Sequence, residues 1–292
     1  MENHLKFRNH LRLISDENDE IYNFHERSLS QHREVEIRDA GALSAPDDID
    51  ALMRLVSHHH SVEVMKCEIR KFIDSVPFGG IILDVGVGWG WHWLGLSVYR
   101  PDLLVCVLDF SLQSLVRAKK VLAKESSNSF IYVCGNALNL KFESESINGY
   151  WSVQTLQHVD SFETAITEAH RVLVDGSQFV SYSLNTQPVI RSLYNVLGRS
   201  YVINGEYSEG INLSRASTEQ FAVVERVFGA PVEARYSEIL FSPEILLNFP
   251  GRQKSLLGKI DNLLTGNSFF SRNFARQCSY HALKDNQLEV NR

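Results

Sequence analysis

Residues 81–90, IILDVGVGWG, decide how this chain folds. The first five are apolar except for Asp84, which is typical of a strand buried on both faces of a sheet. Glycines then stand at Gly86, Gly88 and Gly90, where the chain can turn tightly and its backbone can approach a ligand. A helix that begins behind such a turn favours an anion at its N-terminus. The stretch therefore predicts a strand, a ligand-binding turn and a helix.

Strand-like and helix-like segments alternate after this turn. Apolar runs predict further strands, and amphipathic segments between them predict helices. The expected strands are 103–108, 130–134, 149–153, 178–184, 232–240 and 277–283, and the clearest helices are 111–124 and 162–173. With 81–85 this makes seven strands. The alternation predicts an α/β fold, a doubly wound, mostly parallel seven-stranded sheet covered by helices on both faces.

Composition restricts the class of protein. Of the 292 residues, 44% are hydrophobic and 22% charged, which is ordinary for a globular chain that buries a sizeable core. The net charge of −6 argues against a nucleic-acid partner, whose phosphates attract a basic face. The four cysteines show no paired spacing, and no apolar run approaches the ~20 residues that span a bilayer. We expect a soluble, cytoplasmic protein with reduced thiols and no membrane span.

Two positions near the glycine turn predict the kind of ligand. Dinucleotide-binding turns need a small residue where this chain has the bulky Trp91, and the lysine of a phosphate-binding loop is missing. Asp109, at the end of the second strand, can accept hydrogen bonds from both hydroxyls of a ribose. We therefore expect a ligand that contains a nucleoside but no pyrophosphate. A nicotinamide-dependent oxidoreductase is disfavoured by Trp91 and would be tested by cofactor preference.

The ordered set of motifs resembles the class I S-adenosylmethionine-dependent methyltransferases. The resemblance covers roughly residues 81–184. After the glycine turn come an acidic loop, an adenine-side motif, a fourth strand with its active-site end, and the helix and turn before strand five. These are Asp109-Phe110-Ser111, Gly135-Asn136-Ala137, residues 147–159, and residues 168–176. Each part is common alone, whereas the set in this order and spacing is specific.

The resemblance implies a role for each matching residue toward S-adenosylmethionine and its product S-adenosylhomocysteine. Gly86, Gly88 and Gly90 would let the chain pass the methionine moiety, and Asp84 would meet its ammonium group directly or through water. Asp109 would hold the ribose beside Phe110 and the adenine. Asn136 and Ala137 would contact the adenine edge, and Ser152 and Val153 would line the sulfonium. No metal is expected.

The chain departs from the family pattern at three places. Asn136 and Asn148 stand where this family usually has aspartate, and we expect altered cofactor affinity rather than its loss, because an amide still donates and accepts hydrogen bonds. The aromatic run at 89–93, WGWHW, is also unusual. It would narrow the mouth of the cofactor site or form an aromatic wall for the substrate.

His158, at the end of the fourth strand, is the candidate catalytic base. Transfer of a methyl group from a sulfonium needs such a base mainly when the acceptor is a hydroxyl, and the ordinary pKa of histidine lies near neutrality. The alternative is a structural role, in which His158 packs or forms hydrogen bonds at the cleft. Tyr22 and His25 could fold over the cofactor, and Tyr194, Tyr201 and Tyr207 could form a lid.

The predicted function is methylation of a small-molecule acceptor, with O- and C-methylation left open. The alternative is a catalytically inactive relative that binds a partner, consistent with the acid-to-amide changes. The chain divides into an N-terminal helical cover (1–76), a cofactor-binding Rossmann-like core (77–185), and a lid or insertion with the C-terminal completion of the sheet (186–292). The sequence leaves the acceptor and the oligomeric state open.

Overall fold

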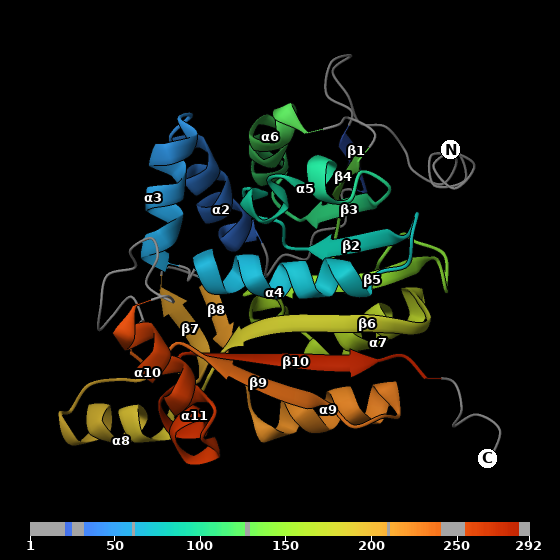
Figure 1. Ribbon diagram of the computed structural model, residues 1–292. Coiled ribbons are helices and arrows are strands. Elements are labelled where there is room, and N and C mark those ends of the chain that lie inside the picture. The colour runs from blue at the N-terminus through green and yellow to red at the C-terminus, as the bar shows by residue number, and fades with distance from the viewer. Residues whose placement is uncertain are drawn as a thin grey trace.

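A central eight-stranded sheet organises the molecule (Figure 1). The computed structural model describes residues 21–24, 32–59, 62–125, 129–208, 211–240 and 255–285. The sheet order is β1-β4-β3-β2-β5-β6-β10-β9. Its strands are β1 (Ile21–Asn23), β2 (Ile81–Val85), β3 (Leu104–Asp109), β4 (Phe130–Cys134), β5 (Ile147–Val153), β6 (Leu173–Leu184), β9 (Glu233–Ser237) and β10 (Gln277–Leu283). The predicted mostly parallel α/β architecture is confirmed.

Helices cover both faces of this sheet, because the strands alternate apolar side chains toward each side. One face packs against α3, α4 and α6, and the other packs against α7 and α9. The helices are α2 (His32–Ser44), α3 (Ile49–His59), α4 (Val62–Ser75), α5 (Leu96–Tyr99), α6 (Leu112–Val121), α7 (Phe162–Val172), α8 (Pro188–Val196), α9 (Thr218–Phe228), α10 (Leu256–Thr265) and α11 (Ser268–Phe274).

The strand directions fix one edge of the sheet as the place for a ligand site. Strands β1 to β6 pair in parallel, so their carboxyl ends meet at one edge. β10 runs antiparallel to both β6 and β9, and Gln277 lies opposite Leu184 and Ser237. Ligands of open α/β sheets bind outside the carboxyl ends of the strands.

The structure differs from the sequence-based prediction in the number of strands. The eighth strand is β1, which pairs in parallel with β4 through Ile21 and Tyr22. These two residues belonged to a segment that we expected to be helical. Three residues are too few to show the period of a strand, and only pairing with β4 defines them as one.

The helix expected behind the glycine turn is also interrupted. A 3-10 helix at Trp91–Trp93 is followed by the four-residue α5. Gly90 and Gly95 precede these segments with φ of 74° and 90°, so two left-handed glycines divide one helix into two short ones. A further hairpin, β7 (Asn204–Ser208) and β8 (Ile211–Ser214), lies in the region we expected to be a lid.

Candidate functional site

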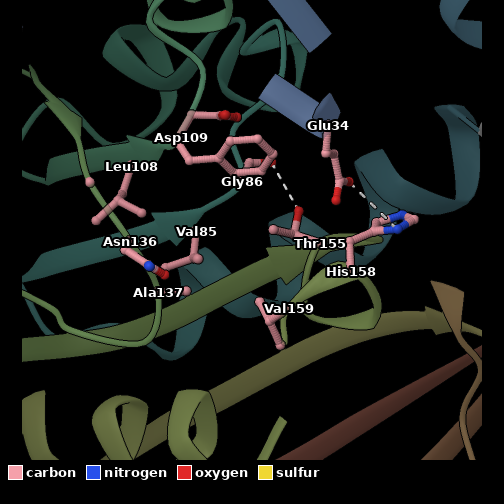
Figure 2. Close-up of a pocket in the computed structure, with 12 residues that line it drawn as sticks. Glu34, Val85, Gly86, Leu108, Asp109, Asn136, Ala137, Thr155, His158 and Val159 are labelled. Atoms are coloured by element: carbon pink, nitrogen blue, oxygen red, sulfur yellow. Dashed lines mark hydrogen bonds and ion pairs between the residues drawn. The ribbon is translucent and has the colours of Figure 1, made fainter. Parts of the chain in front are cut away.

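A cavity opens at the carboxyl edge, where β2, β3, β4 and β5 end (Figure 2). It is lined by Glu34, Val85, Gly86, Leu108, Asp109, Phe110, Gly135, Asn136, Ala137, Thr155, His158 and Val159. Six of the predicted site residues are among these: Gly86, Asp109, Phe110, Asn136, Ala137 and His158. The cavity itself has a volume of about 20 Å³, room for roughly one water molecule. A larger ligand therefore has to displace side chains that cover it.

Asp109 is the buried carboxylate of this cavity. It is 7% exposed and accepts hydrogen bonds from the backbone N–H groups of Ser111 (2.9 Å) and Gly88 (3.1 Å). Burial raises its pKa to about 6, although the two N–H donors act in the opposite direction. The Gly88 bond ties the glycine turn to the end of β3. Asp109 therefore shapes the turn as well as offering acceptor oxygens to a ligand.

The glycine turn needs glycine for different reasons at different positions. Gly86 has φ of 80°, and a Cβ there would come within 1.9 Å of the Thr155 hydroxyl oxygen. A Cβ on Gly90 would contact Ala118 and Leu122 of the α6 region at 3.1 Å. A Cβ on Gly88 would meet nothing within 4 Å. Gly86 thus allows contact with the end of β5, and Gly90 allows contact with α6; neither Gly88 nor Gly90 lines the cavity.

Asp84, one residue before the cavity residue Val85, does not line the cavity. It is 1% exposed and accepts a 2.6 Å hydrogen bond from the indole Nε1 of Trp93. Burial raises the pKa of Asp84 to about 7, and the Trp93 bond moderates the rise. The neighbouring Leu83 and Val85 face the opposite core, as the alternation of a strand requires. Asp84 therefore anchors the loop that follows the glycine turn.

None of residues 89–93 lines the cavity, whereas we expected this aromatic run to narrow the mouth of the cofactor site or to form an aromatic wall for the substrate. Trp91 and Trp93 are 4% and 1% exposed and pack in the core beneath α3 and α4. Their burial follows from the broken helix, which turns the indoles toward the sheet. Ser152 and Val153 also lie outside the cavity lining, and Ser152 donates its hydroxyl hydrogen to the carbonyl oxygen of Val85 at 2.9 Å.

The two asparagines that depart from the family pattern lie at opposite edges of the sheet. Asn136 lines the cavity and accepts a 3.0 Å hydrogen bond from the Leu138 N–H. Asn148, near the amino end of β5, accepts a 2.9 Å bond from the Ile81 N–H. Asn148 thus joins β5 to the start of β2, and only Asn136 can bear on a ligand in the cavity.

The neighbours of His158 determine which of its two ring nitrogens carries the proton in the neutral imidazole. Gln157 accepts a hydrogen bond from the Leu184 N–H (2.8 Å), so its amide nitrogen, 3.1 Å from His158 Nε2, is the donor to that ring atom. His158 Nδ1 then carries the proton and donates to the carbonyl oxygen of Asn212 in β8. Burial lowers the pKa of His158 to about 4, with the nearby Arg38 charge adding to the effect. His158 is therefore uncharged near neutral pH.

Glu34 of α2 is a cavity residue that sequence reasoning missed. It is 4% exposed, accepts a 3.2 Å bond from Arg38, and lies 3.7 Å from His158 Nδ1 (Figure 2). Burial raises the pKa of Glu34 above its ordinary value. Because His158 is uncharged, this approach is a polar contact rather than an ion pair. No motif marks Glu34; its place depends on the docking of α2 against α6.

The other predicted cover residues have separate positions. Tyr22 is buried in β1 and does not line the cavity. Tyr194 and Tyr201 pack edge to face with ring centroids 5.4 Å apart, and Tyr201 donates to Gln187. His25 lies outside the described residues.

Within the described part of the chain, no helix is long and apolar enough to cross a bilayer.

The cavity has the donors, acceptors and walls that a nucleoside requires. Asp109 offers carboxylate oxygens for ribose hydroxyls, and the Asn136 amide supplies a polar edge. Val85, Leu108 and Ala137 provide apolar walls for a base. The residues present therefore fit a ligand of this class, once the covering side chains have moved.

Comparisons with known proteins agree with this geometry. Residues 83–181 match the family model described as a methyltransferase domain. The mitochondrial 2-methoxy-6-polyprenyl-1,4-benzoquinol methylase of Arabidopsis thaliana is 30% identical over 117 residues, 39% of each chain. The demethylmenaquinone methyltransferase of Roseiflexus castenholzii is 34% identical over 117 residues, 39% of this chain and 48% of that one. The matches thus span less than half the length of these curated relatives.

A solved structure shows the same fold. Phosphoethanolamine N-methyltransferase 2 of Haemonchus contortus, in complex with S-adenosyl-L-methionine, superposes with a TM-score of 0.54 at 19% identity, covering 76% of this chain and 53% of that one. The sheet order, the cavity at its carboxyl edge and the matched model define a class I methyltransferase domain. Residues 83–181 therefore carry a methyltransferase domain, the class to which these matched relatives belong.

Proposed function

We propose that the protein binds S-adenosylmethionine and transfers its methyl group to a small-molecule acceptor. The observation that carries this proposal is the meeting of Gly86, Asp109, Phe110 and Asn136 around one cavity. When bound, the cofactor supplies an electrophilic methyl group, and the protein supplies orientation and electrostatics. The curated relatives act on a quinol and on demethylmenaquinone, so a small organic acceptor is the class that their names favour.

Five of the cavity residues bind the cofactor in this proposal, and residues outside the lining hold the glycine turn. Asp109 accepts hydrogen bonds from the ribose hydroxyls, and Phe110 and Ala137 contact the adenine, whose edge meets Asn136. Gly86 gives the methionine moiety its approach to the backbone, with Gly88 and Gly90 shaping the turn. Asp84 holds this turn in place through its hydrogen bond with Trp93. Ser152, which precedes Val153 in β5, does so through its hydrogen bond to the Val85 carbonyl oxygen.

When the group that is methylated is a hydroxyl, His158 is the residue proposed to take up its proton. The ring is neutral near pH 7, which leaves Nε2 unprotonated. Gln157 occupies that lone pair, so proton transfer requires the Gln157 amide to give way. His158→Gln should then lower turnover on a hydroxyl-bearing substrate by a much larger factor than it weakens cofactor binding, since His158 also lines the cavity. Turnover equal to that of wild type would remove this role.

The experiment is calorimetric titration with S-adenosylmethionine and S-adenosylhomocysteine. Wild-type protein should bind both, and Asp109→Ala should weaken binding by about tenfold or more, because one buried charged acceptor is lost. Asp175→Ala is the matched control, since Asp175 lies near the amino end of β6 at the opposite edge. Absence of wild-type binding would overturn the enzyme proposal and favour a partner-binding relative. We also propose the division into a helical cover (1–76), whose β1 joins the sheet, a core (77–185) and a lid with the C-terminal completion of the sheet (186–292).

A further inference from the structure

Three helices expose an unusual amount of apolar surface. None of the nine residues of α8 is buried. α11 contacts both α8 and α10, so the three helices form one face of the molecule (Figure 1). We call this face the apolar platform, and its large apolar members are Val189, Leu193, Val196, Leu197, Leu256, Leu257, Ile260, Leu263, Phe269 and Phe270. Contiguous exposed apolar patches of this kind mark interaction sites.

The exposure of individual side chains is high enough to require an explanation. Val196 is 83% exposed, Leu263 76% and Phe269 62%. A helix as short as α8 is marginal in water without an apolar face packed against something. Single exposed hydrophobic residues are normal, but ten on three touching helices are not.

The charges on this face are of one sign. Residues 188–200 and 255–275 are all described, and their exposed charged side chains are Arg191, Arg199, Lys259 and Arg272. The one acid in these ranges, Asp261, is buried and accepts hydrogen bonds from the Ile239 and Leu240 N–H groups. A basic, apolar face on a chain of net charge −6 is complementary to an anionic lipid surface.

We propose that the apolar platform docks the protein on the surface of a membrane that contains anionic lipids. The apolar side chains enter the boundary of the acyl chains while the arginines and Lys259 meet the headgroup phosphates. A second copy of the chain fits this face less well, because a two-fold contact would bring the same cations together.

The topology places the platform beside the cavity edge. α8 follows β6 at Leu184, while α10 lies beyond the end of β9 and α11 just before β10, and these strand ends lie opposite one another in the sheet. Asn185 donates to the carbonyl oxygens of Arg272 and Ala275, which ties the end of β6 to α11. Docking therefore presents the carboxyl edge of the sheet toward the membrane. Delivery of a lipid-dissolved acceptor to the cavity would follow, a consequence that rests on the proposed methyl transfer.

Flotation of the full-length protein with vesicles tests the docking. Wild type should bind vesicles of phosphatidylcholine mixed with phosphatidylglycerol, should bind phosphatidylcholine alone more weakly, and should be released by added salt. The double variant Leu193→Ser/Phe269→Ser should lower binding about tenfold or more. Lys259→Glu should lower binding to the anionic vesicles and leave binding to neutral ones nearly unchanged.

Phe78→Ser is the matched control, because Phe78 is 90% exposed in the turn before β2, at the other edge of the sheet. Its binding should equal that of wild type. The proposal is overturned if wild type binds neither vesicle, if Phe78→Ser loses as much binding as the double variant, or if sedimentation shows a dimer that the double variant dissociates. S-adenosylhomocysteine titration of the same preparations reports the cofactor proposal separately, since docking needs no cofactor.

Discussion

At the scale of single residues, two aspartates at neighbouring strand ends do different work. Asp109 closes the glycine turn and faces the cavity, whereas Asp84 faces the core and bonds to Trp93. Alternation along the strands puts both carboxylates on the same face of the sheet as Val107, and Asp109 reaches the cavity because it is the last residue of β3. The Trp93 partner of Asp84 could not be predicted, because it depends on the break in the helix at Gly90 and Gly95.

The bond between Trp93 and Asp84 should contribute measurably to stability. Trp93→Phe leaves a buried carboxylate without its donor, so we expect the free energy of unfolding to fall by about 1–3 kcal/mol beyond the loss from packing. Trp151→Phe is the control, because Trp151 is equally buried and its indole N–H has no hydrogen-bond partner among the described residues. Urea unfolding of both variants measures the difference. Equal losses would show that the bond adds nothing.

At the scale of elements, the strands that show as apolar runs could be predicted from the sequence. Elements whose structure or position depends on tertiary contacts could not. Strands β2 to β6 were visible as apolar runs, and the cavity residues among their loops could be found from the motif spacing. β1 and the placement of α2 were not visible, since pairing with β4 and docking against α6 define them. Glu34 was missed for the same reason, although it covers the cavity.

The glycine turn gives the prediction that belongs to this scale. Gly86→Ala forces a Cβ against Thr155 at a φ of 80°, so we expect a loss of about 2–4 kcal/mol in stability together with weaker S-adenosylhomocysteine binding. Gly88→Ala, at φ of 56° with open space around the new Cβ, should cost about 1–2 kcal/mol. Denaturant unfolding and calorimetry check both.

A double variant distinguishes the two causes of the stability loss in Gly86→Ala, the contact of the new Cβ with Thr155 and the strain of a positive φ. Adding Thr155→Gly to Gly86→Ala removes the atoms that the new Cβ meets. Part of the lost stability should therefore return. If the double variant is no more stable than the sum of the two single changes predicts, backbone strain alone accounts for the effect.

At the scale of the whole molecule, buried acids and buried histidines oppose each other in the response to pH. Burial raises the pKa of Asp84 to about 7 and of Asp109 to about 6, while it lowers the pKa of His158 and His281 to about 4. Between about pH 5 and 6 the unfolded chain holds protons on the two histidines and the folded chain holds them on the two aspartates. The two pairs make contributions of opposite sign to the slope of stability against pH, so these four groups together leave that slope small.

Replacing one buried acid or one buried histidine should therefore change the slope of stability against pH in opposite directions. Asp84→Asn removes a proton that only the folded state binds, so stability should rise with pH more steeply than in wild type, by about 1.4 kcal/mol per pH unit. His281→Gln removes a proton that only the unfolded state binds, so the slope should fall by about the same amount. Urea unfolding at a series of pH values between about 5 and 6 gives both slopes. Slopes that shift in the same direction would contradict the opposed burial of these two groups, because linkage ties each sign to the state that holds the proton.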